Sequence, residues 1–236
     1  MSGAGAAPIL VVESDGQLGR AITEQLLADG FDVELARSAE HARALARLSA
    51  PRLAVLGSLE SPPGALELLR EIRRAEEPDT PWHGSLPAIV VGNRGRELEM
   101  LRAFEAGADD FLARGATYVE LRARLRAILR RSASAPSSAG VIEVGALAID
   151  TRAHSVTLDG RDVCLRRMEF ELLVHLAREP ERVFAKPELL RSVWGYRSCG
   201  STRTLDSHAS RLRRKLAPDD ARSWVISVWG VGYRLR

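Results

Sequence analysis

The stretch STRTLDSHASRLRRKL, residues 201–216, predicts an amphipathic helix with one cationic face. Leu205, Ala209, Leu212 and Leu216 recur at helical spacing and would pack into a core. The opposite face carries Arg203, Ser207, Ser210 and Arg214, flanked by Thr204, Arg211, Arg213 and Lys215. Arginine can bind guanine edges through two hydrogen bonds, and hydroxyl groups can bind bases or phosphates. The stretch favours a helix that enters the major groove of DNA; a solvated basic face is the plainer alternative.

The sequence around this helix predicts a winged helix-turn-helix domain. The last residues, WVISVWGVGYRLR, predict a hairpin with strands at 225–228 and 233–235, which would place Trp229, Tyr233 and Arg234 beside the helix. Upstream we expect helices at 168–178 and 187–194, and strands at 141–149, 156–158 and 163–165. Asp159-Gly160 is a hairpin turn signal between the last two of these strands.

The first half of the chain has a different pattern, with short apolar runs alternating with helical spacing. Strands are expected at 9–12, 32–35, 53–56, 88–91 and 110–112. This alternation predicts a doubly wound, five-stranded parallel sheet, so the fold class is α/β followed by α+β. The uncharged stretch SASAPSSAG predicts a linker. The expected domains are therefore residues 1–131 and 141–236, joined by residues 132–140.

Composition indicates a globular protein, with 28% charged and 45% hydrophobic residues. The sequence has no apolar run long enough to span a membrane and no signal-peptide pattern, and its two cysteines lack metal-ligand spacing, so we expect a cytoplasmic protein without membrane association. Residues 1–131 carry 17 arginines and no lysine against 19 acidic residues, a net charge of −2. The rest carries 17 basic and 12 acidic residues, a net charge of +5. The second half therefore favours a polyanionic partner.

Several motifs resemble one family of transcription regulators. They are ILVVESD and GADDFLAR in the first half, and RVFAKPELLRSVWG, TRTLDSHASRLRRKL and VWGVGYR in the second. On these residues the chain resembles OmpR/PhoB-family response regulators of two-component (phosphorelay) systems over essentially its whole length. The resemblance implies a receiver (CheY-like) domain followed by a winged-helix domain that binds double-stranded DNA. An enzyme is not expected, because the sequence has no phosphate-binding glycine loop, nucleophile elbow or metal-spaced histidine cluster.

The resemblance also implies a phosphorylation site, and the matching positions of this chain depart from it. The family carries a phosphoacceptor aspartate after the third strand, two acidic residues after the first, Thr or Ser after the fourth and Lys after the fifth. The matching residues here are Gly57, Glu13 and Ser14, Gly92, and Arg114. Glycine has no nucleophilic oxygen, and Mg²⁺ prefers carboxylate ligands. We expect a degenerate site without phosphoacceptor, metal or cofactor. The alternative is that the small walls at Gly57, Gly92 and Gly115 admit a small-molecule ligand that gates DNA binding.

The resemblance further implies a homodimer that binds tandem half-sites. The charges expected to pair two receivers are Arg102, Asp109, Asp110, Glu120, Arg124, Arg126 and Arg131. Met100 departs from the family, which usually has a basic partner for Glu120 there. The alternative is that these residues form ordinary exposed ion pairs.

Position in the family also implies the DNA contacts. On the helix these are Arg203, Thr204, Ser207, His208, Ser210, Arg211, Arg213 and Arg214; elsewhere they are Lys186, Trp194, Ser227, Trp229 and Arg234. His208 lies near the apolar stripe and has a structural role as its alternative. Trp229 stands where many members carry an arginine that enters the minor groove, and a tryptophan cannot supply that positive charge. The loop at residues 195–201 resembles the family's contact surface for RNA polymerase.

Overall fold

The chain folds into two compact units, Met1–Leu129 and Arg130–Arg236. The computed structural model describes residues 7–60, 64–75, 80–92, 97–133, 140–196, 203–217 and 223–236. The helix α5 (Tyr118–Ala133) continues two residues into the stretch expected to be a linker. Residues 132 and 133 are therefore helical, and residues 134–139 of the expected linker lie outside the described part.

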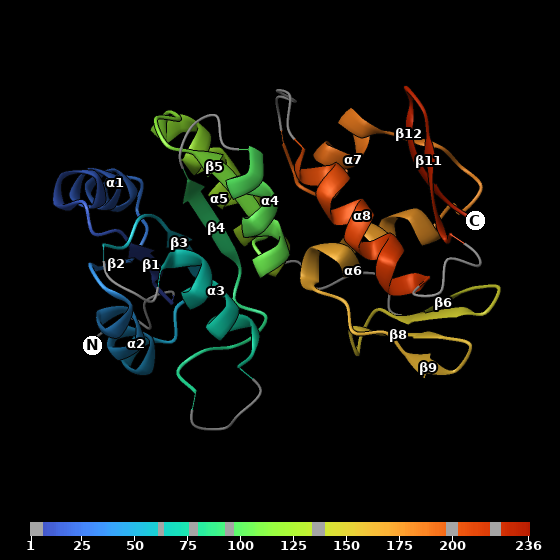
Figure 1. Ribbon diagram of the computed structural model, residues 1–236, viewed down its shortest axis with the longest axis horizontal. Coiled ribbons are helices and arrows are strands. Elements are labelled where there is room, and N and C mark those ends of the chain that lie inside the picture. The colour runs from blue at the N-terminus through green and yellow to red at the C-terminus, as the bar shows by residue number, and fades with distance from the viewer. Residues whose placement is uncertain are drawn as a thin grey trace. The chain divides into compact units, whose positions relative to one another are not determined.

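The first unit is a doubly wound parallel sheet, as predicted (Figure 1). Its strands are β1 (Ile9–Val12), β2 (Val33–Ala36), β3 (Leu53–Leu56), β4 (Ala88–Gly92) and β5 (Asp110–Ala113), arranged in the order β2-β1-β3-β4-β5. The helices are α1 (Gly16–Ala28), α2 (Ala39–Ser49), α3 (Ala65–Arg73), α4 (Glu97–Ala106) and α5. In such sheets, ligands bind beyond the carboxyl ends of the strands, where the strand order reverses. Here the order reverses between β1 and β3, so Glu13 and Gly57 come together.

Helices cover both faces of this sheet, which explains its continuous apolar strands. Alternate residues of β1 and β3 enter two separate cores. Ile9 and Val11 pack with Leu26 of α1 and Leu125 of α5, whereas Leu10 and Val12 pack with residues of α2, α3 and α4. All four residues of β1 and all four of β3 are buried, as the sequence pattern predicts.

Within its described residues, the second unit contains two antiparallel sheets and three helices. One sheet is β6 (Val141–Val144), β7 (Leu147–Asp150), β8 (Ser155–Leu158) and β9 (Arg161–Asp162), and the other is β10 (Phe184–Ala185), β12 (Gly232–Leu235) and β11 (Val225–Val228). The helices are α6 (Arg167–Ala177), α7 (Lys186–Ser192) and α8 (Thr204–Leu216). The winged helix-turn-helix prediction is confirmed.

Three local predictions for this unit are corrected. The single strand expected at 141–149 is two strands, because Gly145 turns the chain with φ +56°. The strand expected at 163–165 lies earlier, at β9, because Asp159 and Gly160 both adopt the positive φ of a tight hairpin turn. Strand β10 was not predicted, because two residues are too short for a periodic signal.

No helix in the described ranges is both long enough and apolar enough to cross a membrane.

Candidate functional site

The pocket at the carboxyl ends of β1 and β3 is filled by an ion pair. The Glu13 side chain is 2% exposed, and its Oε2 accepts a hydrogen bond of 2.8 Å from Arg114 Nη2. The same guanidinium nitrogen donates to Ser58 Oγ at 2.7 Å. Backbone N–H groups of Asp15 and Ser58 also donate to the Glu13 carboxylate, at 3.0 and 3.2 Å. The buried carboxylate thus has its charge neutralised and its oxygens hydrogen-bonded within the chain.

The Glu13 carboxylate lies so close to Gly57 that any side chain at residue 57 would require this carboxylate to move. A Cβ built on Gly57 would overlap Glu13 Oε2 and would lie 3.2 Å from the Val12 carbonyl oxygen. An aspartate at 57 would therefore displace the ion pair. The Glu13–Arg114 pair thus has this position because residue 57 carries no side chain.

The other acidic and polar residues of the pocket have structural roles. Asp15 accepts hydrogen bonds from the N–H groups of Gln17 and Leu18, at 3.0 and 3.1 Å, and so caps the N-terminus of α1. Ser14 donates its backbone N–H to the Ser58 carbonyl at 2.9 Å. Within the part of the chain that the structure describes, no group of three or more His, Cys, Asp or Glu side chains could hold a metal ion.

Gly92, at the end of β4, accommodates the ring of Phe111 from β5. A Cβ at Gly92 would lie 2.6 Å from Phe111 Cε2 and Cζ and 3.1 Å from Glu99 Cδ. The expectation that small walls leave open space is therefore wrong at Gly57 and Gly92, because Glu13 and Phe111 occupy that space. At Gly115 nothing lies within 4 Å of a built Cβ.

The recognition helix α8 presents part of its predicted polar face to solvent. Arg203, Ser210 and Arg214 are exposed, and Ser207 and Arg213 are partly exposed. Arg213 Nε donates to the Val225 carbonyl at 2.9 Å, so this side chain holds β11 against the helix.

Four predicted DNA contacts lie in the interior of the second unit. Trp194 is 0% exposed, and Thr204, His208 and Arg211 are also buried. Trp194 and His208 pack with ring centroids 5.5 Å apart, and Arg211 Nη2 lies 2.7 Å from His208 Nδ1. Side chains with almost no exposed surface present nothing to a groove, so the prediction that these residues contact DNA is wrong.

Glu169 of α6 explains the inward position of Arg211. It is 0% exposed, with Arg211 Nε at 3.2 Å from Oε1 and Lys215 Nζ at 2.7 Å from Oε2. Glu169 was not among the predicted functional residues, although a carboxylate between the apolar residues Met168 and Phe170 of a predicted helix indicates a buried charge that needs a partner.

The wing, β11–β12, is attached to α8 by polar contacts. Tyr233 Oη donates to Asp206 Oδ1 at 2.6 Å, and Lys186 Nζ lies 2.7 Å from the same oxygen. Burial and this hydrogen bond raise the pKa of the Tyr233 hydroxyl, which keeps it protonated as a donor. Ser227 and Trp229 are exposed and Arg234 is partly exposed. Of the predicted polymerase loop, only Gly195 and Tyr196 lie within the described residues.

Comparison with known proteins agrees with this architecture. A family model described as "Transcriptional regulatory protein, C terminal" matches residues 160–235. The transcriptional regulatory protein SrrA of Staphylococcus aureus (strain NCTC 8325 / PS 47) is 32% identical over 234 residues, covering 96% of this chain and 94% of SrrA. The chain belongs to the OmpR/PhoB family of response regulators.

Two solved structures are similar to this response regulator. A point mutant of RitR has a TM-score of 0.73 at 23% identity, covering 98% of this chain and 99% of RitR, and thus shares its fold. DrrB, described as a Thermotoga maritima OmpR/PhoB homologue, has a TM-score of 0.49 at 26% identity, covering 97% of this chain and 98% of DrrB.

The α4–β5–α5 face of the regulator carries a chain of three charged residues. Arg124 Nη1 binds both carboxylate oxygens of Asp110, at 3.0 and 2.9 Å, and Arg124 Nη2 binds Glu120 Oε1 at 2.6 Å. Arg102 is exposed on α4, and Met100 packs partly against the core. Arg102, Asp110, Glu120 and Arg124 are thus placed on the elements where the pairing charges were expected.

Two other residues of the predicted interface lie elsewhere. Arg126 Nη2 lies 3.8 Å from Asp29 Oδ1, and its guanidinium lies over the Phe31 ring, because two residues along a helix turn a side chain by about 200°. Asp109 is buried, where its Oδ2 accepts from Arg73 Nη2 at 2.9 Å and from the Ala88 N–H at 2.8 Å. The predicted pairing roles of Arg126 and Asp109 are therefore wrong. The side chain of Arg131 lies outside the described part.

Proposed function

We propose that this transcriptional regulator binds DNA as a homodimer on tandem half-sites and does so without aspartyl phosphorylation. The observation that carries the proposal is the Glu13 carboxylate, held by Arg114 directly against Gly57. A metal-assisted phosphoryl transfer needs a nucleophilic oxygen and carboxylate ligands for Mg²⁺. The first is absent at residue 57, and the buried carboxylate of the pocket, Glu13, already has a guanidinium as its cation.

Arg114 supplies in this pocket the positive charge that a bound divalent cation would supply elsewhere. Its guanidinium neutralises Glu13 and reaches Ser58 on the loop that follows β3. The loops after β1, β3 and β5 are thereby cross-linked within the chain. A receiver with this arrangement keeps its fold without metal or phosphoryl group.

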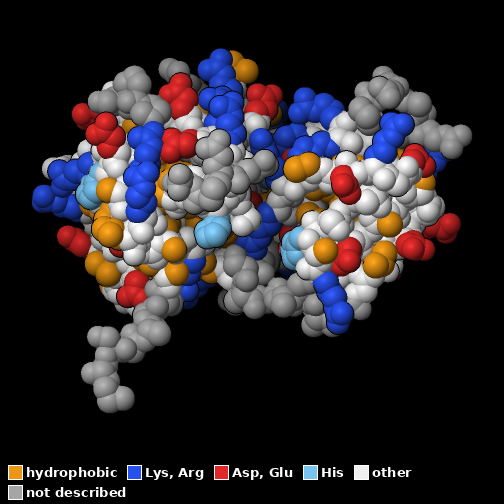
Figure 2. Space-filling view, turned by 90° about the horizontal axis from the view of Figure 1, so that it is seen from below, with side chains coloured by type: hydrophobic (Ala, Val, Ile, Leu, Met, Phe, Trp, Pro, Cys, Tyr) orange, Lys and Arg blue, Asp and Glu red, His pale blue; other side chains and the backbone are white. Residues whose placement is uncertain are grey.

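The charge distribution supports DNA as the partner of the second unit. In Figure 2 basic and acidic side chains are interspersed on the visible face of the first unit, at the left. The excess of positive charge belongs to the second half of the sequence, and two cations are exposed there, Arg203 at the N-cap of α8 and Arg214 on α8. The regulator then acts in the cytoplasm, with RNA polymerase contacted through residues 195–201.

Selection of bound sequences from a random duplex pool, with untreated full-length protein, tests the DNA-binding part of the proposal. We expect two half-sites about one helical turn apart, with binding that weakens steeply as salt rises. Enrichment of single half-sites alone would contradict the dimer, and enrichment of no sequence would contradict sequence-specific binding.

Sedimentation of two charge-reversal variants tests the dimer. Arg102→Glu changes the proposed pairing face, whereas Arg126→Glu changes the surface beside Asp29 and serves as the matched control. We expect Arg102→Glu to shift the protein toward monomer and Arg126→Glu to sediment like wild type. An unchanged dimer in Arg102→Glu would overturn pairing through this face.

A further inference from the structure

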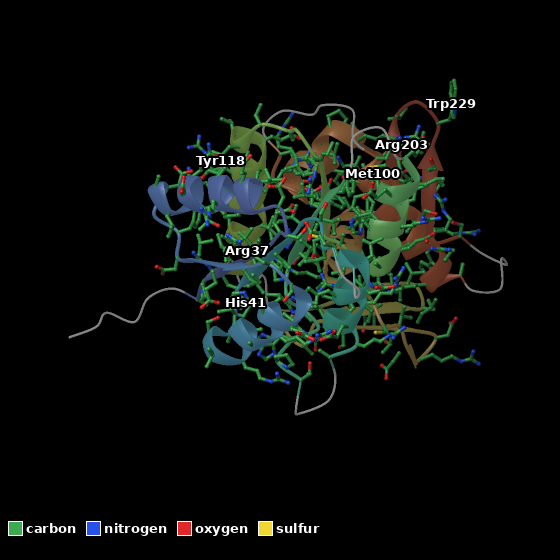
Figure 3. All side chains as sticks on the ribbon, turned by 60° about the vertical axis from the view of Figure 1, so that its left-hand side comes forward. Arg37, His41, Met100, Tyr118, Arg203 and Trp229 are labelled. Atoms are coloured by element: carbon green, nitrogen blue, oxygen red, sulfur yellow. The ribbon has the colours of Figure 1, made fainter. Side chains whose placement is uncertain are left out.

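The sequence contains only two lysines, and both hold the recognition helix α8 by an ion pair. All the other cations among its 34 basic residues are arginines. Lys186 Nζ, on α7, lies 2.7 Å from Asp206 Oδ1 in the first turn of α8, whose N-cap residue Arg203 is labelled in Figure 3. Lys215 Nζ, in the last turn of α8, lies 2.7 Å from Glu169 Oε2 on α6. The two lysines therefore attach opposite ends of the same helix.

The ion pair at Lys215 is more buried than the ion pair at Lys186. The Glu169 side chain is 0% exposed and Lys215 is 33% exposed, whereas the two side chains of the Lys186 pair are 48% and 39% exposed. A buried carboxylate that loses a cation is costly, while an exposed pair contributes little. Without the Lys215 ammonium, Glu169 would keep Arg211 Nε, at 3.2 Å from Oε1. Lys215 is therefore the more important of the two attachments.

Lysine and arginine differ in the reactions that they undergo. Arginine keeps its charge, whereas the lysine amine can be acylated, which removes the charge and the ion-pair donor. Part of each lysine side chain is exposed, so a reagent can approach it. The paired ammonium is not a nucleophile, and reaction requires that the ion pair opens and Nζ loses a proton. Acylation of lysine side chains in this chain would thus act on the two attachments of α8 and on no other side chain.

We infer that Lys215, and with smaller effect Lys186, is an acylation site at which an acyl thioester loosens α8 and weakens sequence-specific DNA binding. The neutral Nζ amine attacks the thioester carbonyl carbon, a C–N amide bond forms, the C–S bond breaks, and the thiol leaves with a proton from Nζ. No oxidant or reductant is required. The amide is neutral, so Glu169 loses the cation at its Oε2. The inference rests on the proposed DNA binding and adds a means of regulation that uses no residue of the receiver pocket.

Incubation of the full-length protein with acetyl-coenzyme A at mildly alkaline pH, followed by peptide mass spectrometry, tests whether the two sites react. We expect acetyl groups on Lys186 and Lys215, with the α-amino group of the chain as the internal standard. The double variant Lys186→Arg/Lys215→Arg should be acetylated at the α-amino group alone. A wild-type protein that is also acetylated only there would overturn the inference.

DNA binding is then measured on full-length protein with Nε-acetyllysine installed at residue 215 during translation. We expect about tenfold weaker binding to a duplex with one selected half-site, and affinity within about twofold of wild type for a random-sequence duplex. Lys215→Arg, which keeps the charge but cannot be acylated, is the matched control and should bind both duplexes like wild type. Acetyllysine at residue 186 should weaken specific binding only about threefold, because that ion pair is more exposed.

Glu169→Gln separates the loosening of α8 from the simple loss of one positive charge. This variant has no carboxylate that needs Lys215, so acetylation at residue 215 should cause no further loss of specific affinity. A lysine that bound a DNA phosphate would behave differently, because its acetylation would weaken binding to both duplexes and lower the salt slope by about one unit. Hydrogen exchange of the α8 amides gives a reading without DNA, and we expect faster exchange after acetylation at residue 215.

The results that would overturn the inference are distinct from one another. Equal loss of affinity on both duplexes, with a lower salt slope, would assign Lys215 to the phosphate contacts. Unchanged specific affinity and unchanged hydrogen exchange after acetylation would remove the regulation and leave the proposed function standing. Failure of wild type to bind any duplex would overturn the proposed function and the effect on DNA, while hydrogen exchange would still decide whether acylation loosens α8.

Discussion

Among the described residues, each unit of this regulator buries one glutamate beside an arginine. In the first unit Glu13 lies 2.8 Å from Arg114, at the edge of a parallel sheet. In the second, Glu169 lies 3.2 Å from Arg211 and 2.7 Å from Lys215, beneath the recognition helix. The first pair lies at the positions that the resemblance matches to the family's metal and phosphoryl site. The second pair secures α8 to α6, while Arg203, Ser210 and Arg214 remain exposed.

The comparison shows that location, and not the chemistry of the ion pair, decides what a buried pair does. A buried pair adds little net stability compared with apolar packing, but removal of one partner leaves an uncompensated charge and is costly. In the receiver the pair holds the Glu13 carboxylate against Gly57. Beneath α8 it holds Arg211 in the interior, whereas the Lys215 side chain keeps 33% of its surface exposed.

The largest expected effect is the loss of Glu169. Glu169→Ala leaves Arg211 buried without its carboxylate, so we expect the free energy of unfolding of the second unit to fall by about 3–5 kcal/mol. Urea unfolding of the full chain, with the two units followed separately, measures it. Glu171→Gln on the same helix is the control, and a Glu169→Ala variant as stable as this control would contradict the role of the pair.

Loss of Arg114 gives a smaller effect in the first unit. The Arg114 side chain is 30% exposed, so water can partly compensate for the missing guanidinium, and we expect Arg114→Ala to destabilise the receiver by about 2–3 kcal/mol. The double variant Glu13→Gln/Arg114→Ala should recover part of the loss, because the charge that needs a partner is gone. Equal stability of Arg114→Ala and wild type would mean that the Glu13–Arg114 pair, unlike the Glu169–Arg211 pair, does not stabilise its unit.

Restoration of an aspartate at residue 57 sharpens the account of the pocket. Gly57→Asp forces its Cβ into Glu13 Oε2, and we expect a destabilisation of about 1–3 kcal/mol without phosphorylation by acetyl phosphate. Gly57→Ala adds the same Cβ without a carboxylate. The difference in stability between the two variants therefore gives the effect of the carboxylate alone. Phosphorylation of the single variant, seen by intact mass, would mean that the Glu13–Arg114 pair does not block the site.

The smallest effect on stability is expected on the exposed face of α8. Arg214→Ala should change the free energy of unfolding by less than about 0.5 kcal/mol, while it weakens DNA binding and lowers the salt slope by about one unit. Anisotropy titrations across salt measure both. A variant with wild-type affinity and slope would remove Arg214 from the phosphate contacts.

Sequence reasoning was most successful where local patterns decide the structure. Strands 9–12, 53–56 and 225–228 were predicted to the residue, because short apolar or alternating runs between turn residues leave little choice of boundary. The substitution of the switch residues was also visible, since Gly57 and Gly92 can be read directly. Their meaning was not, because Glu13 and Arg114 are 101 residues apart and only the fold brings them together.

The errors on the helices have a common physical cause. His208 lies only about 60° from the apolar stripe of α8, and whether such a border position faces water depends on the neighbouring helix. Arg211 turned inward because α6 provides Glu169, a partner that the sequence of α8 does not contain. Arg126 was assigned to the pairing face together with Arg124 on the resemblance to the family, although helical geometry alone sends the two to different sides of α5.

The central claim is that the receiver needs no phosphoryl group, and one binding constant tests it directly. The dissociation constant of full-length protein for a selected tandem duplex is measured after incubation with acetyl phosphate and Mg²⁺, and again after incubation with a metal chelator. We predict values that agree within about twofold, because residue 57 has no oxygen to phosphorylate. The measurement is sensitive, since a change of about 1.4 kcal/mol in binding free energy is tenfold in the dissociation constant. Tenfold tighter binding after acetyl phosphate, with the mass of one phosphoryl group added to the protein, would contradict the account.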